Sequence, residues 1–319
     1  MTRYPQGLPQ LSNQLFLTDG GIETTLIFHE GHNLPYFAAY DLLKQPFGTE
    51  SLRKYFCTYA QLAYLYGVGF VLESPTWRAS ADWGEKLGDS AEDLAALNRK
   101  SIELLHEIRG EYESKRSPMV VSGCVGPRGD GYSPAEIMRA EAAEQYHTAQ
   151  IQAFREAKAD MVCAITMTYP EEAIGITRAA QAANLPVAIS FTVETDGCLP
   201  NGQTLQSAIE QVDSATEQGP AYYMINCAHP THFEHLFAAP APWQARIRGI
   251  RANASTKSHA ELDEAETLDD GNPAELGAQY HQLRQQLPHI TIVGGCCGTD
   301  HRHIKSIWQA CVGLVSAMT

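Results

Sequence analysis

The sequence predicts a single-domain (β/α)₈ (TIM) barrel, and three observations support this prediction. Apolar, β-branched runs bounded by turn residues recur eight times, and each is followed by a segment with helical spacing. Strict alternation of strand and helix predicts a parallel sheet, and eight repeats predict that the sheet closes. The 319 residues suit one such barrel, and no Pro-, Gly- or Ser-rich linker divides residues 1–319. An open doubly wound sheet is the alternative, but the Gly-x-Gly-x-x-Gly turn typical of it is missing after the first strand.

The expected elements follow one another in regular order. The β-type runs predict strands at 15–19, 69–73, 119–123, 161–166, 187–192, 222–227, 247–252 and 290–295. Apolar residues at helical spacing predict helices at 50–66, 90–115, 134–157, 171–183, 203–218, 231–238, 273–287 and 301–317. Ser133-Pro134-Ala135-Glu136 has the composition of a helix start. Residues 255–272 are polar and acidic, so we expect a long βα loop that could act as a lid.

Composition excludes several classes of protein. The net charge of -14, without a Lys/Arg-rich run, argues against nucleic acid as a partner. No segment has the apolar length of a signal peptide core or of a membrane span, so no membrane partner and a cytoplasmic location are expected. The eight cysteines are then expected to be reduced thiols, some of them metal ligands. The oligomeric state stays open, and a homo-oligomer is compatible with the sequence.

Three cysteines form the main candidate site. Cys296 and Cys297 lie in the frame Gly294-Gly295-Cys296-Cys297-Gly298-Thr299 at the end of the eighth expected strand, and Cys227 ends the sixth. In a barrel, all three would lie on the rim formed by the carboxyl ends of the strands. Three thiolates are suitable ligands for Zn²⁺ and leave one coordination position for a substrate. The alternative is that they are small buried side chains, since free cysteine is often buried.

Other cysteines and histidines are weaker candidates. Packing accounts for Cys57, Cys163 and Cys311, and Cys198 has no partner. Cys124 is a further candidate because it lies near a strand end. Five histidines follow the sixth and eighth strands: His229, His232, His235, His301 and His303. One of them could complete the metal coordination, or all of them could lie on polar surfaces.

Motifs along nearly the whole chain resemble the homocysteine S-methyltransferase family. The family includes the betaine and S-methylmethionine enzymes and the homocysteine module of cobalamin-dependent methionine synthase. The motifs are Asp19-Gly20-Gly21, Val125-Gly126-Pro127, Ser190-Phe191-Thr192, Asn226-Cys227 and Gly294-Gly295-Cys296-Cys297-Gly298. The resemblance implies a (β/α)₈ barrel whose zinc is held by Cys227, Cys296 and Cys297. It also implies that the substrate thiol takes the open zinc position, loses its proton and attacks a methyl group.

The resemblance also implies residues that bind the amino-acid part of homocysteine. The aspartate that helps to bind the amino group matches Asp19, and backbone amides that bind the carboxylate match Gly20 and Ser74. Asp19 could instead be an ordinary turn residue before two glycines.

Two departures from the family pattern leave the acceptor open. The family usually has a glutamate after the fourth strand, and this chain has none in Ala164-Ile165-Thr166-Met167-Thr168-Tyr169-Pro170. Either another residue pairs with the substrate ammonium, or the substrate differs. Glu73 and Glu23 are candidate replacements, although Glu73 could be a strand-end charge that faces solvent. After the seventh strand, Arg251-Ala252-Asn253-Ala254-Ser255 keeps only Asn253 of the family's usual run.

The expected function is therefore zinc-dependent transfer of a methyl group from a small onium donor, such as S-methylmethionine, to homocysteine in methionine biosynthesis. One alternative is the same chemistry on another thiol or selenol. A zinc hydrolase and a non-enzymatic zinc-binding protein are further alternatives.

Overall fold

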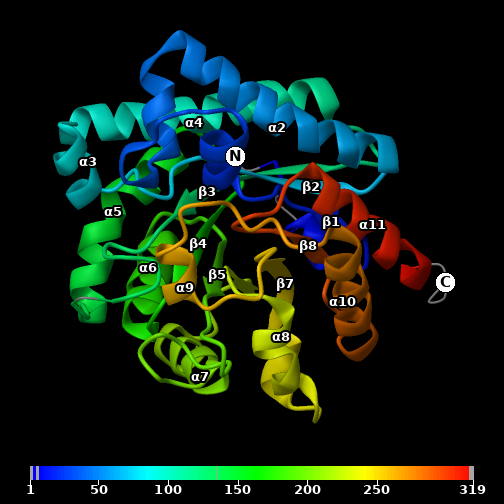
Figure 1. Cartoon of the computed structure of the whole chain (residues 1–319). Coiled ribbons are helices and arrows are strands. Elements are labelled where there is room, and N and C mark those ends of the chain that lie inside the picture. The colour runs from blue at the N-terminus through cyan, green and yellow to red at the C-terminus, as the bar shows by residue number, and fades with distance from the viewer. Residues whose placement is uncertain (1–2, 5–6, 135, 316–319) are drawn as a thin grey trace.

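The barrel is closed by eight parallel strands in sequence order. The structure is a computed structural model that describes residues 3–4, 7–134 and 136–315. Phe16 in the first strand pairs with Gly69 on one side and with Ile292 on the other, which closes the sheet. The strands are β1 (Phe16–Leu17), β2 (Gly69–Glu73), β3 (Met119–Val125), β4 (Met161–Met167), β5 (Val187–Phe191), β6 (Tyr222–Asn226), β7 (Ile247–Ala252) and β8 (Ile292–Gly295). The predicted fold class is confirmed (Figure 1).

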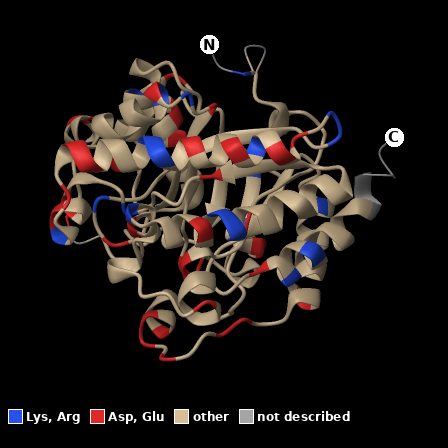
Figure 2. Cartoon of the chain, turned by 90° about the horizontal axis from the view of Figure 1, so that it is seen from above, with Lys and Arg blue, Asp and Glu red and all other residues tan. Residues whose placement is uncertain are grey.

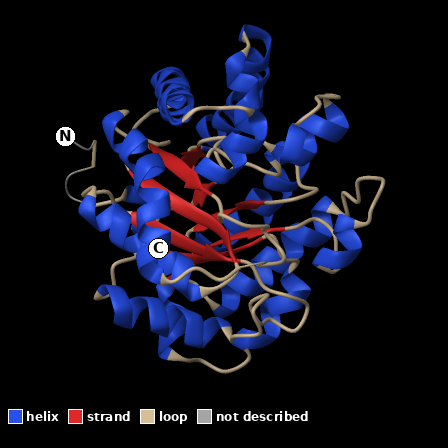
Figure 3. Ribbon diagram, turned by 90° about the vertical axis from the view of Figure 1, so that its left-hand side faces the viewer, coloured by secondary structure: helices blue, strands red, loops and turns tan. Residues whose placement is uncertain are grey.

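Helices surround the strands (Figure 3). In α2, Leu52, Tyr55, Phe56 and Tyr59 are buried at helical spacing, so this stripe packs on the barrel. The longer helices are α2 (Pro46–Tyr66), α4 (Ala91–Tyr112), α5 (Ala140–Glu156), α6 (Pro170–Ala182), α7 (Leu205–Thr216), α10 (Pro273–Gln286) and α11 (His301–Val315). The shorter ones are α1 (Ile22–Thr24), α3 (Ala81–Leu87), α8 (Pro230–Phe233) and α9 (His259–Asp263). Of these, α1, α3 and α9 were not expected from the sequence.

The largest error in the predicted elements concerns the start of α5. The helix begins at Ala140 rather than at 134, and Ala135 of the expected cap lies outside the described residues. The reason is a competing turn, because Asp130 Oδ1 accepts hydrogen bonds from the backbone amides of Tyr132 and Ser133. This turn directs residues 129–134 toward the barrel mouth instead of into a helix.

The end of the barrel opposite the site is filled by the N-terminal segment. Leu8 packs with Phe16, Val71 and other inward-facing residues of the strands. Gln10 is fully buried, and its side chain donates to the Tyr222 hydroxyl. A solid interior therefore lies beneath the carboxyl ends of the strands, where polar residues gather.

Figure 2 shows basic segments scattered among acidic ones, without a basic stripe in that view. In the described part of the chain, no helix is both long and apolar enough to cross a membrane.

Candidate active site

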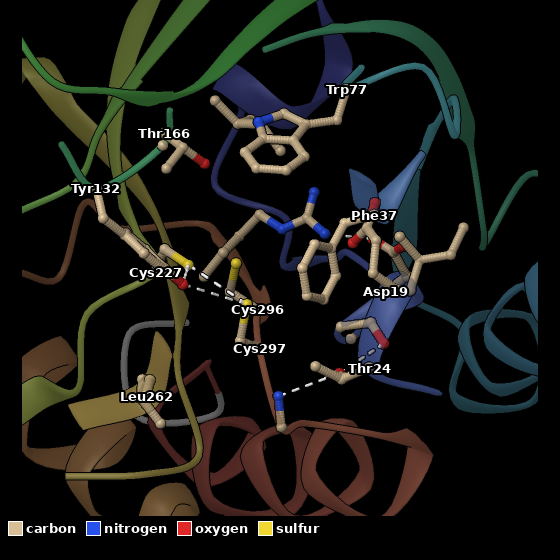
Figure 4. Close-up of a pocket in the computed structure, with 18 of the residues that line it drawn as sticks. Asp19, Thr24, Phe37, Trp77, Tyr132, Thr166, Cys227, Leu262, Cys296 and Cys297 are labelled. Atoms are coloured by element: carbon tan, nitrogen blue, oxygen red, sulfur yellow. Dashed lines mark hydrogen bonds and ion pairs between the residues drawn. The ribbon is translucent and has the colours of Figure 1, made fainter. Parts of the chain in front are cut away.

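Three cysteines converge at the mouth of the barrel. Cys227 directly follows β6, and Cys296 and Cys297 directly follow β8. The sulfur atoms of Cys227 and Cys297 are 3.5 Å apart, and all three lie within 4.8 Å of one another (Figure 4). A tetrahedral zinc with Zn–S bonds of about 2.3 Å would place two sulfurs about 3.8 Å apart. Among the described residues, this is the one group of three or more potential ligands so placed.

The backbone at both strand ends is shaped to bring these sulfurs together. Cys227 has a φ of 57°, a left-handed conformation that turns the chain sharply as it leaves β6. Gly295 is packed so closely that a Cβ there would overlap the side chain of Thr299. The bend beyond it is fixed by the amide of Thr299, which donates to the carbonyl of Cys296. The bend that two adjacent cysteine ligands require is therefore present.

The thiols are free and electrostatically coupled. All eight cysteines lack a disulfide partner. Hydrogen bonds from the thiols of Cys227 and Cys297 lower the pKa of Cys296, and the charge of Arg251 acts in the same direction. The hydrogen bond to Cys296 and burial raise the pKa of Cys227. A cation is needed to hold all three as thiolates, so the cluster fits zinc in both geometry and chemistry.

Tyr132 and His259 contact this cluster and were not found from the sequence. The Tyr132 hydroxyl lies 3.1 Å from the Cys227 sulfur, and its ring stacks on His259 with centroids 4.1 Å apart. His259 Nε2 donates to the Cys227 carbonyl over 2.7 Å, and its Nδ1 lies 3.0 Å from Glu194. His259 therefore holds the left-handed backbone of Cys227 without belonging to the cysteine group.

Replacing His259 by alanine is expected to weaken zinc binding about 10- to 100-fold, because residues that orient ligands have effects of that size. Competition with a chromophoric chelator measures the change. His235→Ala is the matched control, because His235 bonds only the exposed Asp196 carbonyl. Equal zinc affinity in the two variants would show that His259 does not position Cys227 for zinc binding.

The cysteines lie at one side of a cavity with a volume of about 280 Å³. Trp77, Phe37 and Tyr132 stand around it in Figure 4. The expected loop at 255–272 contains α9 and contributes Leu262, Asp263, Ala265, Thr267, Leu268 and Asp269 to the lining. The cavity therefore has the three cysteines on one side, aromatic side chains around it and residues of the loop at 255–272 in its lining, which is a form typical of small-molecule sites.

Arg251, in β7, also lines the cavity. Its guanidinium contacts Asp19 Oδ1 at 2.6 Å and also pairs with Glu73, and Nε donates to the Gly295 carbonyl. The other carboxylate oxygens are also engaged, because Asp19 accepts from Tyr55 and Glu73 accepts from Ser122. All three charged side chains are buried.

This arrangement corrects the expectations for Glu73. It neither faces solvent nor offers a free carboxylate to a substrate, because it is paired inside the barrel. Burial raises the pKa of both Asp19 and Glu73, and the charge of Arg251 opposes that shift. A buried arginine with two carboxylates forms a closed ionic group.

The remaining predicted residues separate into two groups. Gly20, Glu23 and Ser74 line the cavity, and Glu23 has no ion-pair partner in the described chain. The amide of Ser74 donates to the Ser122 carbonyl, so it cannot bind a substrate carboxylate as expected. Asn253 is buried and is not part of the cavity lining.

None of the five candidate histidines belongs to the cysteine group. His229 bonds Thr231, and His232 bonds the Thr256 carbonyl. His303 pairs with Asp300. Cys124 lines the cavity but lies outside the cysteine group. Among the described residues, the group that could hold a metal ion therefore consists of three sulfurs without a histidine.

Comparison with known proteins gives concordant results. A family model described as homocysteine S-methyltransferase matches residues 16–311. A protein of Brassica oleracea var. italica named selenocysteine Se-methyltransferase is 25% identical, over 93% of this chain and 88% of that protein. Homocysteine S-methyltransferase 2 of Arabidopsis thaliana is 22% identical, over 92% of each.

Solved structures show the same fold. The oxidized form of the Escherichia coli homocysteine methyltransferase MmuM aligns with a TM-score of 0.72 at 20% identity, over 95% of this chain and 98% of that one. The metallated form aligns with a TM-score of 0.69 at 20% identity, over 93% and 96%.

Proposed function

Because the chain belongs to the homocysteine S-methyltransferase family, and is thus a methyltransferase, we propose that it moves a methyl group from a small onium donor to homocysteine, forming methionine. The observation that carries the proposal is the convergence of three cysteine sulfurs on one side of a cavity at the barrel mouth. The family match sets aside the zinc hydrolase and the non-enzymatic alternatives. The eight free thiols support a reducing compartment, and we propose the cytoplasm.

Cys227, Cys296 and Cys297 would hold the zinc and leave its fourth position toward the cavity. A zinc ion there would supply the positive charge that keeps the acceptor sulfur deprotonated, since a free thiol of pKa about 8.5 is mostly protonated at pH 7. The protein residues orient the acceptor and exclude water. The loop at 255–272 would contribute to the exclusion of water, because several of its residues line the cavity.

The cavity suits a cationic methyl donor. Its aromatic wall includes Trp77 and Phe37, and aromatic faces attract onium cations. Asp130, Asp263 and Asp269 add negative charge to the lining. In the transfer, the acceptor sulfur forms a bond to the methyl carbon as the bond from that carbon to the donor sulfur breaks. The electron pair of the broken bond stays with the donor, which leaves as a neutral thioether.

A selenol is the second candidate acceptor. It is supported by the name of the Brassica relative, selenocysteine Se-methyltransferase. Selenols ionise more readily than thiols and would need less help from the metal. Competition between homocysteine and selenocysteine for limiting donor would rank the two acceptors.

Purified zinc-loaded protein should form methionine from homocysteine when supplied with S-methylmethionine, and a panel of sulfonium and betaine donors would define the donor class. The product is measured by mass spectrometry with a deuterated methyl group, so that transferred methyl is distinguished from contaminating methionine. Absence of labelled methionine with every donor would overturn the proposal.

A further inference from the structure

The carboxylates expected to hold a substrate ammonium are already neutralised by the protein. Asp19 and Glu73 share the guanidinium of Arg251, and each of their four oxygens has a partner. A substrate ammonium brought to this pair would meet the arginine cation at close range. An amino-acid acceptor therefore needs a different anionic contact.

Glu23 is a carboxylate that could provide this contact. It is the middle residue of the short helix α1 (Ile22–Thr24), which follows Asp19-Gly20-Gly21, and it lines the cavity. Within the described residues no other side chain pairs with its carboxylate, and the hydrogen bond from its own backbone amide lowers its pKa less than burial raises it. Burial raises the pKa of Glu23 to about 7, with a smaller contribution from the charge of Cys296. A cationic ligand would compensate this carboxylate.

Arg78 is a cation on the lining of the same cavity. Its side chain is 4% exposed and is held between Trp77 and Trp83, with the guanidinium carbon 3.9 and 3.7 Å from the ring centroids. Nη1 donates to the Gly129 carbonyl, and Nη2 lies 3.6 Å from the half-exposed Asp130. The Nε–H is buried without any partner. Burial lowers the pKa of Arg78 to about 10, so the guanidinium remains charged at pH 7.

These two groups and the cysteines lie around one cavity. All of them line it, and the charge of Glu23 acts on Arg78 while the charge of Cys296 acts on Glu23, so Glu23 is within electrostatic reach of both neighbours. Homocysteine carries an ammonium, a carboxylate and a thiol, which match a carboxylate, a guanidinium and a metal-binding cluster.

We propose that Glu23 and Arg78 form a clamp for the zwitterionic end of the acceptor, with the ammonium at Glu23 and the carboxylate at Arg78. The clamp rests on the proposed function and defines its acceptor class as α-amino-acid thiols or selenols. It replaces the glutamate missing from residues 164–170, and it explains how Arg251 can occupy Asp19 and Glu73 without abolishing recognition of an amino acid.

Calorimetry on zinc-loaded protein tests the clamp with three ligands. These are homocysteine, 4-mercaptobutyrate, which lacks the amino group, and 3-aminopropane-1-thiol, which lacks the carboxylate. Glu23→Gln should weaken binding of homocysteine and of the aminothiol about 10- to 100-fold, the size of a charge-assisted contact, and leave 4-mercaptobutyrate within about 3-fold. Arg78→Met should weaken homocysteine and 4-mercaptobutyrate by a similar factor and spare the aminothiol.

Controls separate recognition from folding. Glu50→Gln changes an exposed carboxylate of α2 and should leave all three dissociation constants unchanged. If Arg78→Met is unfolded by circular dichroism, Arg78→Lys keeps the cation, loses the planar donor pattern and should still weaken the two carboxylate ligands selectively.

Two outcomes have different meanings. If wild-type protein binds homocysteine but Glu23→Gln weakens homocysteine and 4-mercaptobutyrate equally, or weakens neither, the clamp is wrong and the proposed function stands. If wild-type protein with full zinc content binds none of the three ligands, the proposed acceptor fails and the clamp fails with it.

Discussion

Replacing Cys297 by serine is expected to lower methyl transfer by about 10³-fold or more and to abolish stoichiometric zinc binding. Without the metal, the acceptor thiol is only about 3% ionised at pH 7, and this lowers the rate by a factor of about 30. Loss of the fixed sulfur position adds a factor of about 10² or more. Zinc content by mass spectrometry and initial rates with homocysteine measure the two effects together.

The control for this variant is Cys57→Ser. Cys57 lies in α2 and outside the cysteine group, so its replacement should leave zinc content and rate unchanged. Stoichiometric zinc in Cys297→Ser would contradict the ligand assignment. Full activity in a zinc-free variant would contradict the role of the metal in thiol activation.

Replacing Arg251 by methionine is expected to destabilise the fold by about 3 to 5 kcal/mol. The substitution leaves Asp19 and Glu73 buried close together without their shared cation, and an uncompensated buried charge has an effect of that size. Urea unfolding followed by circular dichroism measures the loss. Glu73→Gln in the same background should recover part of the stability, because one buried charge is removed.

The effect of Arg251→Met should depend on pH. Burial already raises the pKa of both carboxyls in the folded protein, and removal of the guanidinium raises them further. The folded variant then holds protons more tightly than the unfolded chain, so its stability is retained at acidic pH and lost as pH rises through the raised pKa values. The deficit against wild type should be smaller at pH 5 than at pH 8. A deficit that is equal at both values would mean that lost packing, not lost charge, causes it.

The fold could be predicted largely because the strands of a closed parallel barrel are buried on both faces. Each strand is a short apolar run, and β2 and β7 have the predicted bounds. The start of α5 was missed because the Asp130 turn satisfies backbone donors that a helix would otherwise leave free. Helix propensity alone does not predict whether the turn or the helix forms at such a position.

The site could be predicted where residues of the same chemistry follow the ends of strands. It was predicted less well where side chains from distant segments contact one another. The three cysteines follow strand ends and have a shared chemistry. Tyr132 and His259 approach from loops whose paths have no clear sequence signal. Arg251 was visible only as a departure from a motif. A charged residue near the end of a buried strand requires partners of opposite charge. That requirement could have predicted the ion pairs of Arg251 with Asp19 and Glu73.

Cys227, Cys296 and Cys297 are expected to hold a metal whose fourth position receives the acceptor sulfur. Visible absorption of the cobalt-substituted protein, recorded with and without homocysteine, tests this expectation because the spectrum of cobalt(II) depends on its ligands. Addition of homocysteine should strengthen the sulfur-to-metal charge-transfer band and shift the ligand-field bands, whereas methionine should not. An identical spectrum at saturating homocysteine would show a closed site and contradict the claim.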